Sequence, residues 1–313
     1  MVLPGSARKV DGMAWASATT AWERQSVWSQ TADRLKAGLA RRRTTVLVLS
    51  SAGAALALAS SQLAVEGSAR IVSFAAAFAM AAAALVRQRV GSSELARWVQ
   101  ARSVSEALKA EVFYFLCRCA PYDSPDRDAR LDEEVARLET DAEALLPETL
   151  TVEPKPRALP AVHDRASYVG ERLSPQIDRY YAPMATTMAR RGRRSRQVEI
   201  GLALVAAVLT AAAGAFAVAA VGAWAAVVTT VAASVAAHAA AERFDFLAVE
   251  YARTAGELRR LRTRGGWRDC PQPTGPQFVR RCEEIISVQN DKWMAKWGST
   301  DGADATGTTG SKT

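Results

Sequence analysis

The stretch that decides the fold is IGLALVAAVLTAAAGAFAVAAVGAWAAVVTTVAASVAAHAAA, at residues 200–241. It contains no Asp, Glu, Lys, Arg or Pro, and its single ionisable side chain is His238. A bilayer core about 30 Å thick is crossed by about 20 helical residues that rise about 1.5 Å each. The stretch is therefore long enough for two membrane-spanning helices joined by a tight turn, which we predict over 198–219 and 221–241.

A second apolar run occupies residues 44–86 and is interrupted only by Glu66 and Arg70. It predicts two more transmembrane helices, over 44–65 and 69–87, with the charged pair at the tip among the outer headgroups. The 44–65 segment is the weaker one, because its Ser, Thr and Gln residues oppose the contribution of its Leu and Val residues, but a hairpin can insert as a pair. The fold class predicted is an all-α membrane protein, with four transmembrane helices as two hairpins and long cytoplasmic helical extensions.

Basic residues gather at the ends of the apolar runs, in a chain whose net charge is +8. Those that we expect to face lipid headgroups are Arg41, Arg42, Arg43, Arg190, Arg191, Arg193 and Arg194. Arginines in such positions indicate cytoplasmic flanks and suit a bilayer with anionic headgroups. Residues 1–20 lack the apolar core of a signal peptide. We therefore expect a multi-pass protein of the inner (plasma) membrane with both termini in the cytoplasm. A nucleic-acid partner is not favoured, because the bases border apolar segments.

The rest of the chain divides where the periodicity changes and where prolines cluster. An acidic amphipathic helix is predicted over 127–146, with Asp126 as its natural cap, and a Pro-rich linker follows. The predicted order is a disordered N-terminus (1–19), a first helix–hairpin–helix repeat (20–120), the acidic helix and linker (121–164), a second repeat (165–264), a C-terminal amphipathic helix (265–297) and a disordered tail (298–313).

An internal repeat relates the two halves of the chain at an offset of 151 residues. The segment ARSVSE at 101–106 reappears as ARTAGE at 252–257, and the same offset carries Arg42-Arg43 onto Arg193-Arg194 and Cys119 onto Cys270. Several features in one register favour a duplication over coincidence. Both copies have the same orientation, since an even number of crossings separates them.

Further residues point to a known family. Before the second hairpin these are QIDRYY at 176–181 and the basic run at 190–196; after the first hairpin they are Trp98, Arg102, SEALKAE at 105–111, Phe115 and Tyr122. With the hairpins, they resemble the SLATT superfamily, the two-transmembrane effector domains of bacterial conflict systems. The resemblance implies two tandem copies over most of residues 20–265, the first with Ser29-Gln30 near the place of the tyrosine pair. It implies a membrane effector triggered by a partner protein, and it brings no catalytic residues.

Two pairs of charged residues occupy equivalent positions in the repeats, namely Arg102 with Glu106 and Arg253 with Glu257. Each pair has the spacing of an i,i+4 ion pair, which contributes about 0.3–0.5 kcal/mol on a solvated surface. The alternative is a latch, meaning an ion pair that joins the cytoplasmic helices of the two repeats. The recurrence of the pairs in both repeats favours the latch but does not exclude an ion pair within one helix.

His238 and Glu242 lie four residues apart at the inner end of the fourth predicted crossing. An ionisable group inside a membrane is a candidate for proton or ion handling. The plainer interpretation is that His238, close to the interface, stays neutral or reaches the headgroups. Small residues also recur every four positions, as at Gly53, Ala57 and Ser61, and they let helix backbones approach closely in lipid, although an Ala-rich composition would supply many of them anyway.

The sequence contains no enzyme signature. It lacks a phosphate-binding glycine loop, an H-E-x-x-H helix and a nucleophile elbow. The two histidines and the four cysteines are too scattered for a zinc site, so we predict no catalysis, no cofactor and no metal. The cysteines are expected to be reduced, buried or idle thiols; they are Cys117, Cys119, Cys270 and Cys282.

These observations favour a non-enzymatic integral membrane protein, a pore-forming or membrane-perturbing effector of a bacterial conflict or defence system. We expect a homo-oligomer and a cytoplasmic sensor protein as partners. Two alternatives stay open. One is a membrane-anchored scaffold that recruits cytoplasmic partners through its soluble helices, and the other is a soluble helical bundle whose Ala-rich helices form an ordinary core.

Overall fold

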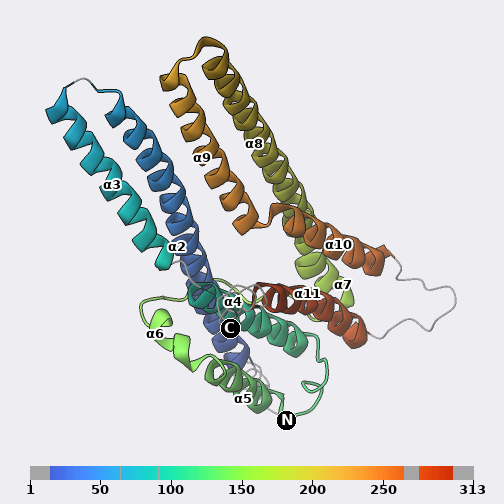
Figure 1. Ribbon diagram of the computed structural model, residues 1–313. Coiled ribbons are helices and arrows are strands. Elements are labelled where there is room, and N and C mark those ends of the chain that lie inside the picture. Colours follow the sequence, from blue (N-terminus) through green and yellow to red (C-terminus); the bar gives the residue numbers. More distant parts are fainter. Residues whose placement is uncertain (1–14, 64, 90–91, 264–274, 299–313) are drawn as a thin grey trace, which may run out of the picture. The chain divides into compact units, whose positions relative to one another are not determined.

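The computed structural model describes residues 15–63, 65–89, 92–263 and 275–298 (Figure 1). Every regular element in these ranges is helical, which confirms the all-α class. The chain forms two compact units. We call the first the bundle, with Met1–Lys36, Ser92–Pro183 and Tyr251–Thr313, and the second the hairpin unit, with Ala37–Gly91 and Met184–Glu250.

The hairpin unit consists of two antiparallel helix pairs (Figure 1). The first pair is the apolar part of α2 (Ala16–Ser61) with α3 (Glu66–Gln88), and the second is α8 (Ala182–Phe216) with α9 (Ala219–Glu242). Four helical stretches of the described chain are long and apolar enough to cross a membrane. The fold is therefore the predicted one, with four such helices as two hairpins that continue into longer helices.

The apolar side chains of the hairpins point outward. Phe74 and Phe78 on α3 are 78% and 76% exposed, and Phe216 at the end of α8 is 76% exposed. Exposed apolar side chains of this kind mark a membrane or protein contact, and lipid tails would solvate them. The hairpins therefore lack the ordinary buried core that the soluble-bundle alternative requires.

Small residues bring the helices of each hairpin close together. A Cβ atom added at Gly53 on α2 would lie 2.8 Å from the Met80 side chain and 3.4 Å from the Ala76 carbonyl oxygen of α3. At Gly222 on α9, a Cβ atom would lie 3.5 Å from Ala213 of α8. The close approach that we expected from small residues thus occurs in the first hairpin, where a side chain at Gly53 would displace Met80.

Two residues with left-handed backbone conformation end helices of the second hairpin. Ala217 has φ 55° and ends α8, so the turn falls at residues 217–218, slightly earlier than the sequence suggested. Arg243 has φ 48° and separates α9 from α10 (Phe244–Thr263). A left-handed residue cannot continue a right-handed helix. The fourth predicted crossing and the helix that follows it are therefore two helices.

The bundle is built around α4 (Ser92–Leu116), which packs against α5 (Arg127–Thr140) and α11 (Gly275–Gly298). One face of α4 meets the start of α2 in a buried core made of Trp28, Ala32, Trp98, Ala101, Val104, Leu108, Ala142 and Leu145. The first tryptophan belongs to α2, the second to α4. The aromatic residues before and after the first hairpin thus form one core.

The acidic segment differs from its prediction. Helix α5 ends at Thr140 and is followed by a 3-10 turn, η1 (Glu143–Leu145), and by α6 (Leu146–Thr149), which has Pro147 in its first turn. Leu145 is buried although it is not α-helical, so the apolar spacing reflected tertiary contact and not one long helix. Asp126 occupies the N-cap position, but its carboxylate accepts from Arg130 Nε at 2.7 Å and makes no capping bond.

The predicted Pro-rich linker lies along α2 as an extended strap, which we define as residues 151–158. The Trp22 indole donates to the Ala158 carbonyl at 3.1 Å, Gln30 donates to the Glu153 carbonyl at 2.8 Å, and the Lys155 amide donates to Ser26 Oγ at 3.0 Å. Backbone groups without strand partners are satisfied here by side chains. The segment is therefore a docked part of the bundle.

The helix that leads to the second hairpin widens twice. After α7 (Arg165–Tyr168), capped by Asp164, the chain forms π-helical turns η2 (Val169–Leu173) and η3 (Gln176–Tyr181) before α8. Pro175 lies between them and has no backbone N–H for an α-helical bond. Such widened turns are frequent at functional sites, and these two carry Arg172 and the tyrosine pair.

The predicted disordered N-terminus (1–19) overlaps α2, which begins at Ala16, because residues 16–19 continue its apolar face and no breaker precedes Trp22. The rest of that segment up to residue 14, the stretch 264–274 and most of the predicted tail lie outside the described residues.

Candidate functional site

Arg102 and Glu106 on α4 lie in a buried ionic cluster of the bundle. The Glu106 side chain is 6% exposed, and Arg102 Nη2 lies 2.8 Å from its Oε1. Lys109 Nζ lies 3.1 Å from the same oxygen. Residues three and four positions apart share a helix face, so the two cations reach Glu106 from the turns on either side of it. In this pair Glu106 is therefore buried and Arg102 partly buried, and Lys109 is a second cation that the predicted pair did not include.

Arg172 and Glu283 complete the cluster. Arg172 on η2 donates from Nε and Nη2 to Oε1 and Oε2 of Glu283 on α11, at 2.9 and 3.0 Å. The same Nη2 lies 3.8 Å from Glu106 Oε2, and Tyr168 Oη donates to Glu283 at 2.8 Å. A bidentate arginine–carboxylate pair is strong and directional. The cluster thus joins α4, η2 and α11.

The cluster is costly to disturb because its two carboxylates, Glu106 and Glu283, are buried. Glu106 Oε2 is buried and has no hydrogen-bond donor among the residues that the structure describes. A buried acceptor in this state costs about 1–3 kcal/mol, and removal of one partner from a buried ion pair costs about 3–5 kcal/mol. The arrangement is therefore stable only while α4, η2 and α11 keep these charges paired.

The charges of the cluster oppose the effect of burial on its acid. Burial alone would raise the pKa of Glu106, but Lys109, Arg102 and Arg172 together lower that pKa to about 2. Burial lowers the pKa of Lys109, and Glu106 opposes that shift. For Arg172, burial is overcome by Glu283, and its pKa is raised. Glu106 is thus a carboxylate throughout the physiological range.

A cluster of three tyrosines lies beside these charges. Tyr180 and Tyr181 of η3 pack edge-on with ring centroids 5.1 Å apart, and both contact Tyr251 of α10, at 6.0 and 6.2 Å. Arg262 Nη1 on α10 also binds Asp178 of η3 at 2.8 Å. Burial raises the pKa of Tyr181 and Tyr251. The tyrosine pair of the motif at 176–181 therefore anchors α10 to η3.

The second predicted pair has a different environment from the first. Arg253 Nε lies 3.0 Å from Glu257 Oε1, with the side chains 48% and 37% exposed. Equivalent residues of the repeat are therefore buried in one copy and half-exposed in the other. A bond between the two repeats does exist, but it joins Glu106 to Arg172.

Neither Arg172 nor Glu283 carries a signal that the sequence could reveal. The offset of 151 residues aligns Arg172 with Ala21, and Glu283 lies beyond both repeats. They are 111 residues apart, and only the folding of α11 against η2 brings them together. The one local indication in the sequence is Pro175, which lies close to Arg172 and lacks the backbone N–H of an α-helical bond.

The end of the hairpin unit where α9 finishes holds the other predicted ionisable pair. Glu242 on α9 accepts from Arg43 Nη1 of α2 at 3.0 Å, so Arg43 joins the two hairpins instead of pointing only to headgroups. His238 lines a cavity of the hairpin unit together with Arg43. Of the other predicted headgroup-facing residues, Arg42 is partly buried, and the exposed ones are Arg41, Arg190, Arg191, Arg193 and Arg194.

The three described cysteines are free and buried. Burial raises the pKa of Cys119 to about 11 and that of Cys117 and Cys282 to about 12, so their thiols are protonated and poorly nucleophilic. Cys270 lies outside the described residues. Within the described ranges, no group of three His, Cys, Asp or Glu side chains is placed to hold a metal ion.

Comparison with known families places this architecture. Residues 168–293 match the family of SMODS and SLOG-associating 2TM effector domain 1, also called SLATT_1. Residues 26–129 match DUF4231, a family described as a protein of unknown function. No curated protein and no solved structure matches the chain. The first match begins at Tyr168 and contains the motif at 176–181, the second hairpin, and Arg172 and Glu283. Residues 168–293 therefore form a SLATT domain, and this part of the chain belongs to the SLATT superfamily.

Proposed function

We propose that this protein is a membrane effector that permeabilises the bilayer when its ionic cluster opens. The observation that carries the proposal is the continuity between the cluster and an apolar helix. Arg172 lies in a helical stretch, Arg165–Phe216, that runs without a non-helical break into the second hairpin. A change in its pairing would therefore act on the start of a membrane helix.

The cluster has the properties of a two-state element. Arg172 and the two carboxylates are buried and mutually paired, so partial opening leaves buried charges without their partners and is disfavoured. Full opening hydrates all of them at once. A partner that binds the open bundle shifts this equilibrium by its difference in affinity for the two states. The trigger that we propose is a cytoplasmic sensor protein, and the opened chains would associate as a homo-oligomer.

In this proposal the protein spans the inner membrane four times, with both termini in the cytoplasm. Arg41 and the basic run at 190–196 come just before the apolar segments in the sequence. The positive-inside rule puts such arginines on the cytoplasmic side. We assign no catalytic step. The effector class is supported by the family of residues 168–293, and the pore is our own inference.

The alternative, a membrane-anchored scaffold, would recruit partners through the acidic segment and the linker. Its support is weaker, because the strap at 151–158 is bound to α2. Arg157 Nη2 donates to the Trp22 carbonyl at 2.8 Å, and its guanidinium lies 3.7 Å from the centre of the Trp22 ring. The carbonyls of Glu153 and Ala158 and the amide of Lys155 are therefore not available to a partner.

Reconstitution of the full chain in liposomes that contain a fluorescent dye tests the proposal. We expect dye release when the sensor partner is added, and none when it is omitted. Glu133→Lys on the exposed face of α5 separates the two functions without removing the core of the bundle, because a scaffold would lose its partner and an effector would retain toxicity to the host cell. Absence of release under every partner and membrane composition would overturn the effector function.

A further inference from the structure

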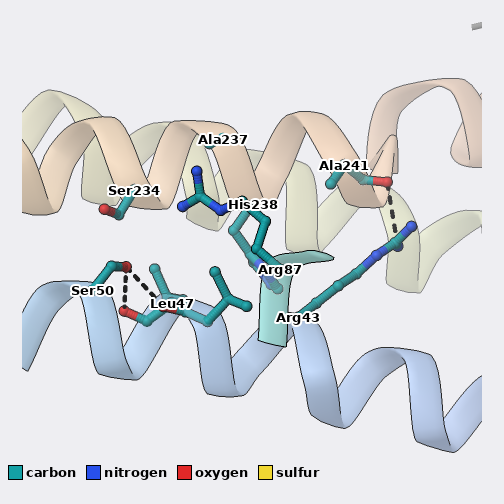
Figure 2. Close-up of a pocket in the computed structure, with 9 residues that line it drawn as sticks. Arg43, Leu47, Ser50, Arg87, Ser234, Ala237, His238 and Ala241 are labelled. Atoms are coloured by element: carbon teal, nitrogen blue, oxygen red, sulfur yellow. Dashed lines mark hydrogen bonds between the residues drawn. The ribbon is translucent and has the colours of Figure 1, made fainter. Parts of the chain in front are cut away.

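A cavity in the hairpin unit gathers basic side chains from three apolar helices. It has a volume of about 310 Å³, which is at the lower end for small-molecule sites, and its lining includes Arg43 of α2, Arg87 of α3 and His238 of α9 (Figure 2). Val46, Leu47 and Ala237 supply apolar walls. The cavity is therefore amphipathic, because it has both basic and apolar side chains in its lining.

The charges in this cavity are not balanced. Arg43 is bound to Glu242 at 3.0 Å, so one cation and one anion cancel. Within the described ranges, the side chains of Arg87 and His238 have neither a hydrogen-bond nor an ion-pair partner. Two groups with free donors thus line the same cavity, and an anion would satisfy both.

The serine hydroxyls of the cavity do not compete for this role. Ser50 Oγ donates to the Val46 carbonyl at 2.7 Å, and Ser234 Oγ donates to the Thr230 carbonyl at 2.9 Å. Each hydroxyl has spent its single proton on its own helix. The donors left for a ligand are therefore the guanidinium of Arg87 and an imidazole N–H of His238.

The position of the cavity in the sequence indicates which anion would occupy it. Arg43 immediately precedes the apolar part of α2, Arg87 is at the end of α3, and His238 is one turn from the end of α9. In a membrane these ends lie at one depth, that of the cytoplasmic headgroups. Anionic lipid phosphates are concentrated there, with acyl chains beside them.

We propose that this cavity is a binding site for the phosphate of an anionic phospholipid, held by Arg87 and His238, with the acyl chains against Val46, Leu47 and Ala237. The bound lipid bridges α3 of the first hairpin and α9 of the second, and so fixes the two hairpins together. This inference requires that the hairpins lie in a membrane, as the proposed function assumes, but it does not require that they conduct ions.

Native mass spectrometry of the full chain, purified in neutral detergent and stripped of lipid, tests the site. We expect the first phosphatidylglycerol to bind about five- to tenfold more tightly than phosphatidylcholine. The reason is that attraction between a basic side chain and an anionic lipid contributes about 1 kcal/mol or more, which corresponds to this ratio of affinities. Arg87→Gln and His238→Gln should each reduce this preference to less than about twofold. Arg89→Gln is the matched control, because it removes an exposed charge near the same helix end but not from the cavity, and it should retain the preference.

Two further arms decide what is recognised. Ala237→Leu fills the cavity without changing its charge, and it should also abolish the preference. If this variant keeps it, or if Arg89→Gln loses it as Arg87→Gln does, the preference comes from surface charge and the site is refuted. If a large excess of inorganic phosphate displaces phosphatidylglycerol, the cavity takes a free anion and the lipid assignment is wrong. Because binding is measured in detergent, failure of the pore would leave these results unchanged.

Discussion

Arg172 binds Glu283 through two parallel hydrogen bonds, from Nε and Nη2, at 2.9 and 3.0 Å. The two side chains are 6% and 1% exposed. The pair joins the helix that enters the second hairpin to the last helix of the bundle, and Glu106 reaches the same guanidinium from α4. This relationship makes the bundle sensitive to changes at a few buried charges.

Removal of one member of this pair should destabilise the bundle strongly. Arg172→Gln leaves the Glu283 carboxylate buried without its cation, which costs about 3–5 kcal/mol. Thermal unfolding of the full chain in detergent, followed by circular dichroism, should show a lower transition temperature. Arg253→Gln removes a half-exposed arginine from the same repeat and should change stability by less than about 0.5 kcal/mol. Equal effects of the two variants would contradict the buried network.

The bundle should lose stability in acid through Glu106. Its pKa in the folded chain is about 2, below the ordinary value of 4.5. Its contribution is therefore fully present above pH 4.5 and is lost as the pH falls from 4.5 towards 2, on the order of 3 kcal/mol. The difference between the wild type and Glu106→Gln in urea titrations at several pH values isolates this contribution. A difference that stays constant over that range would show that Glu106 is not held as an ion.

Replacement of Gly53 should disrupt the first hairpin. A side chain there would collide with Met80 at 2.8 Å and press on the Ala76 carbonyl, so Gly53→Leu should cost about 1–3 kcal/mol as an overpacked contact. Gly201 on α8 has no neighbour within 4 Å of an added Cβ atom, and Gly201→Leu should be neutral. Thermal stability in lipid nanodiscs compares the two variants, and a neutral Gly53→Leu would argue against tight α2–α3 packing.

The strap should be released by the loss of Arg157. Arg157→Ala removes a cation–π contact and a hydrogen bond to the Trp22 carbonyl, together worth about 1–3 kcal/mol. Limited proteolysis should then cut within 151–158 faster than in the wild type. Lys155→Ala removes the same charge while its backbone amide keeps the bond to Ser26 Oγ, and its cleavage rate should match the wild type.

The sequence predicted the features that depend on local composition. Uninterrupted apolar runs predicted all four long apolar helices, and their pairing as hairpins followed from run length. The details that it missed depend on tertiary contact. Ala217 ends α8 by its backbone conformation, Leu145 is buried outside a helix, and the strap looked like a linker because its partners lie more than 100 residues away on α2.

The candidate site divides in the same way. Arg253 and Glu257 pair locally, as their spacing suggested, because a helix brings residues four apart onto one face. Arg172 and Glu283 have no fixed spacing, and chain folding alone joins them. Arg43 was predicted to face the headgroups, but it pairs with Glu242. The fold brings the end of α9 next to α2, and this proximity is not visible in the sequence.

The central claim, that opening of the ionic cluster permits the hairpins to permeabilise a membrane, is tested most directly by ion flux without a partner. Arg172→Gln and Arg253→Gln chains, reconstituted at equal density in liposomes loaded with potassium, should behave differently. We predict potassium efflux from Arg172→Gln vesicles and none from Arg253→Gln or wild-type vesicles. Equal efflux from all three, or none from Arg172→Gln at full incorporation, would contradict the claim.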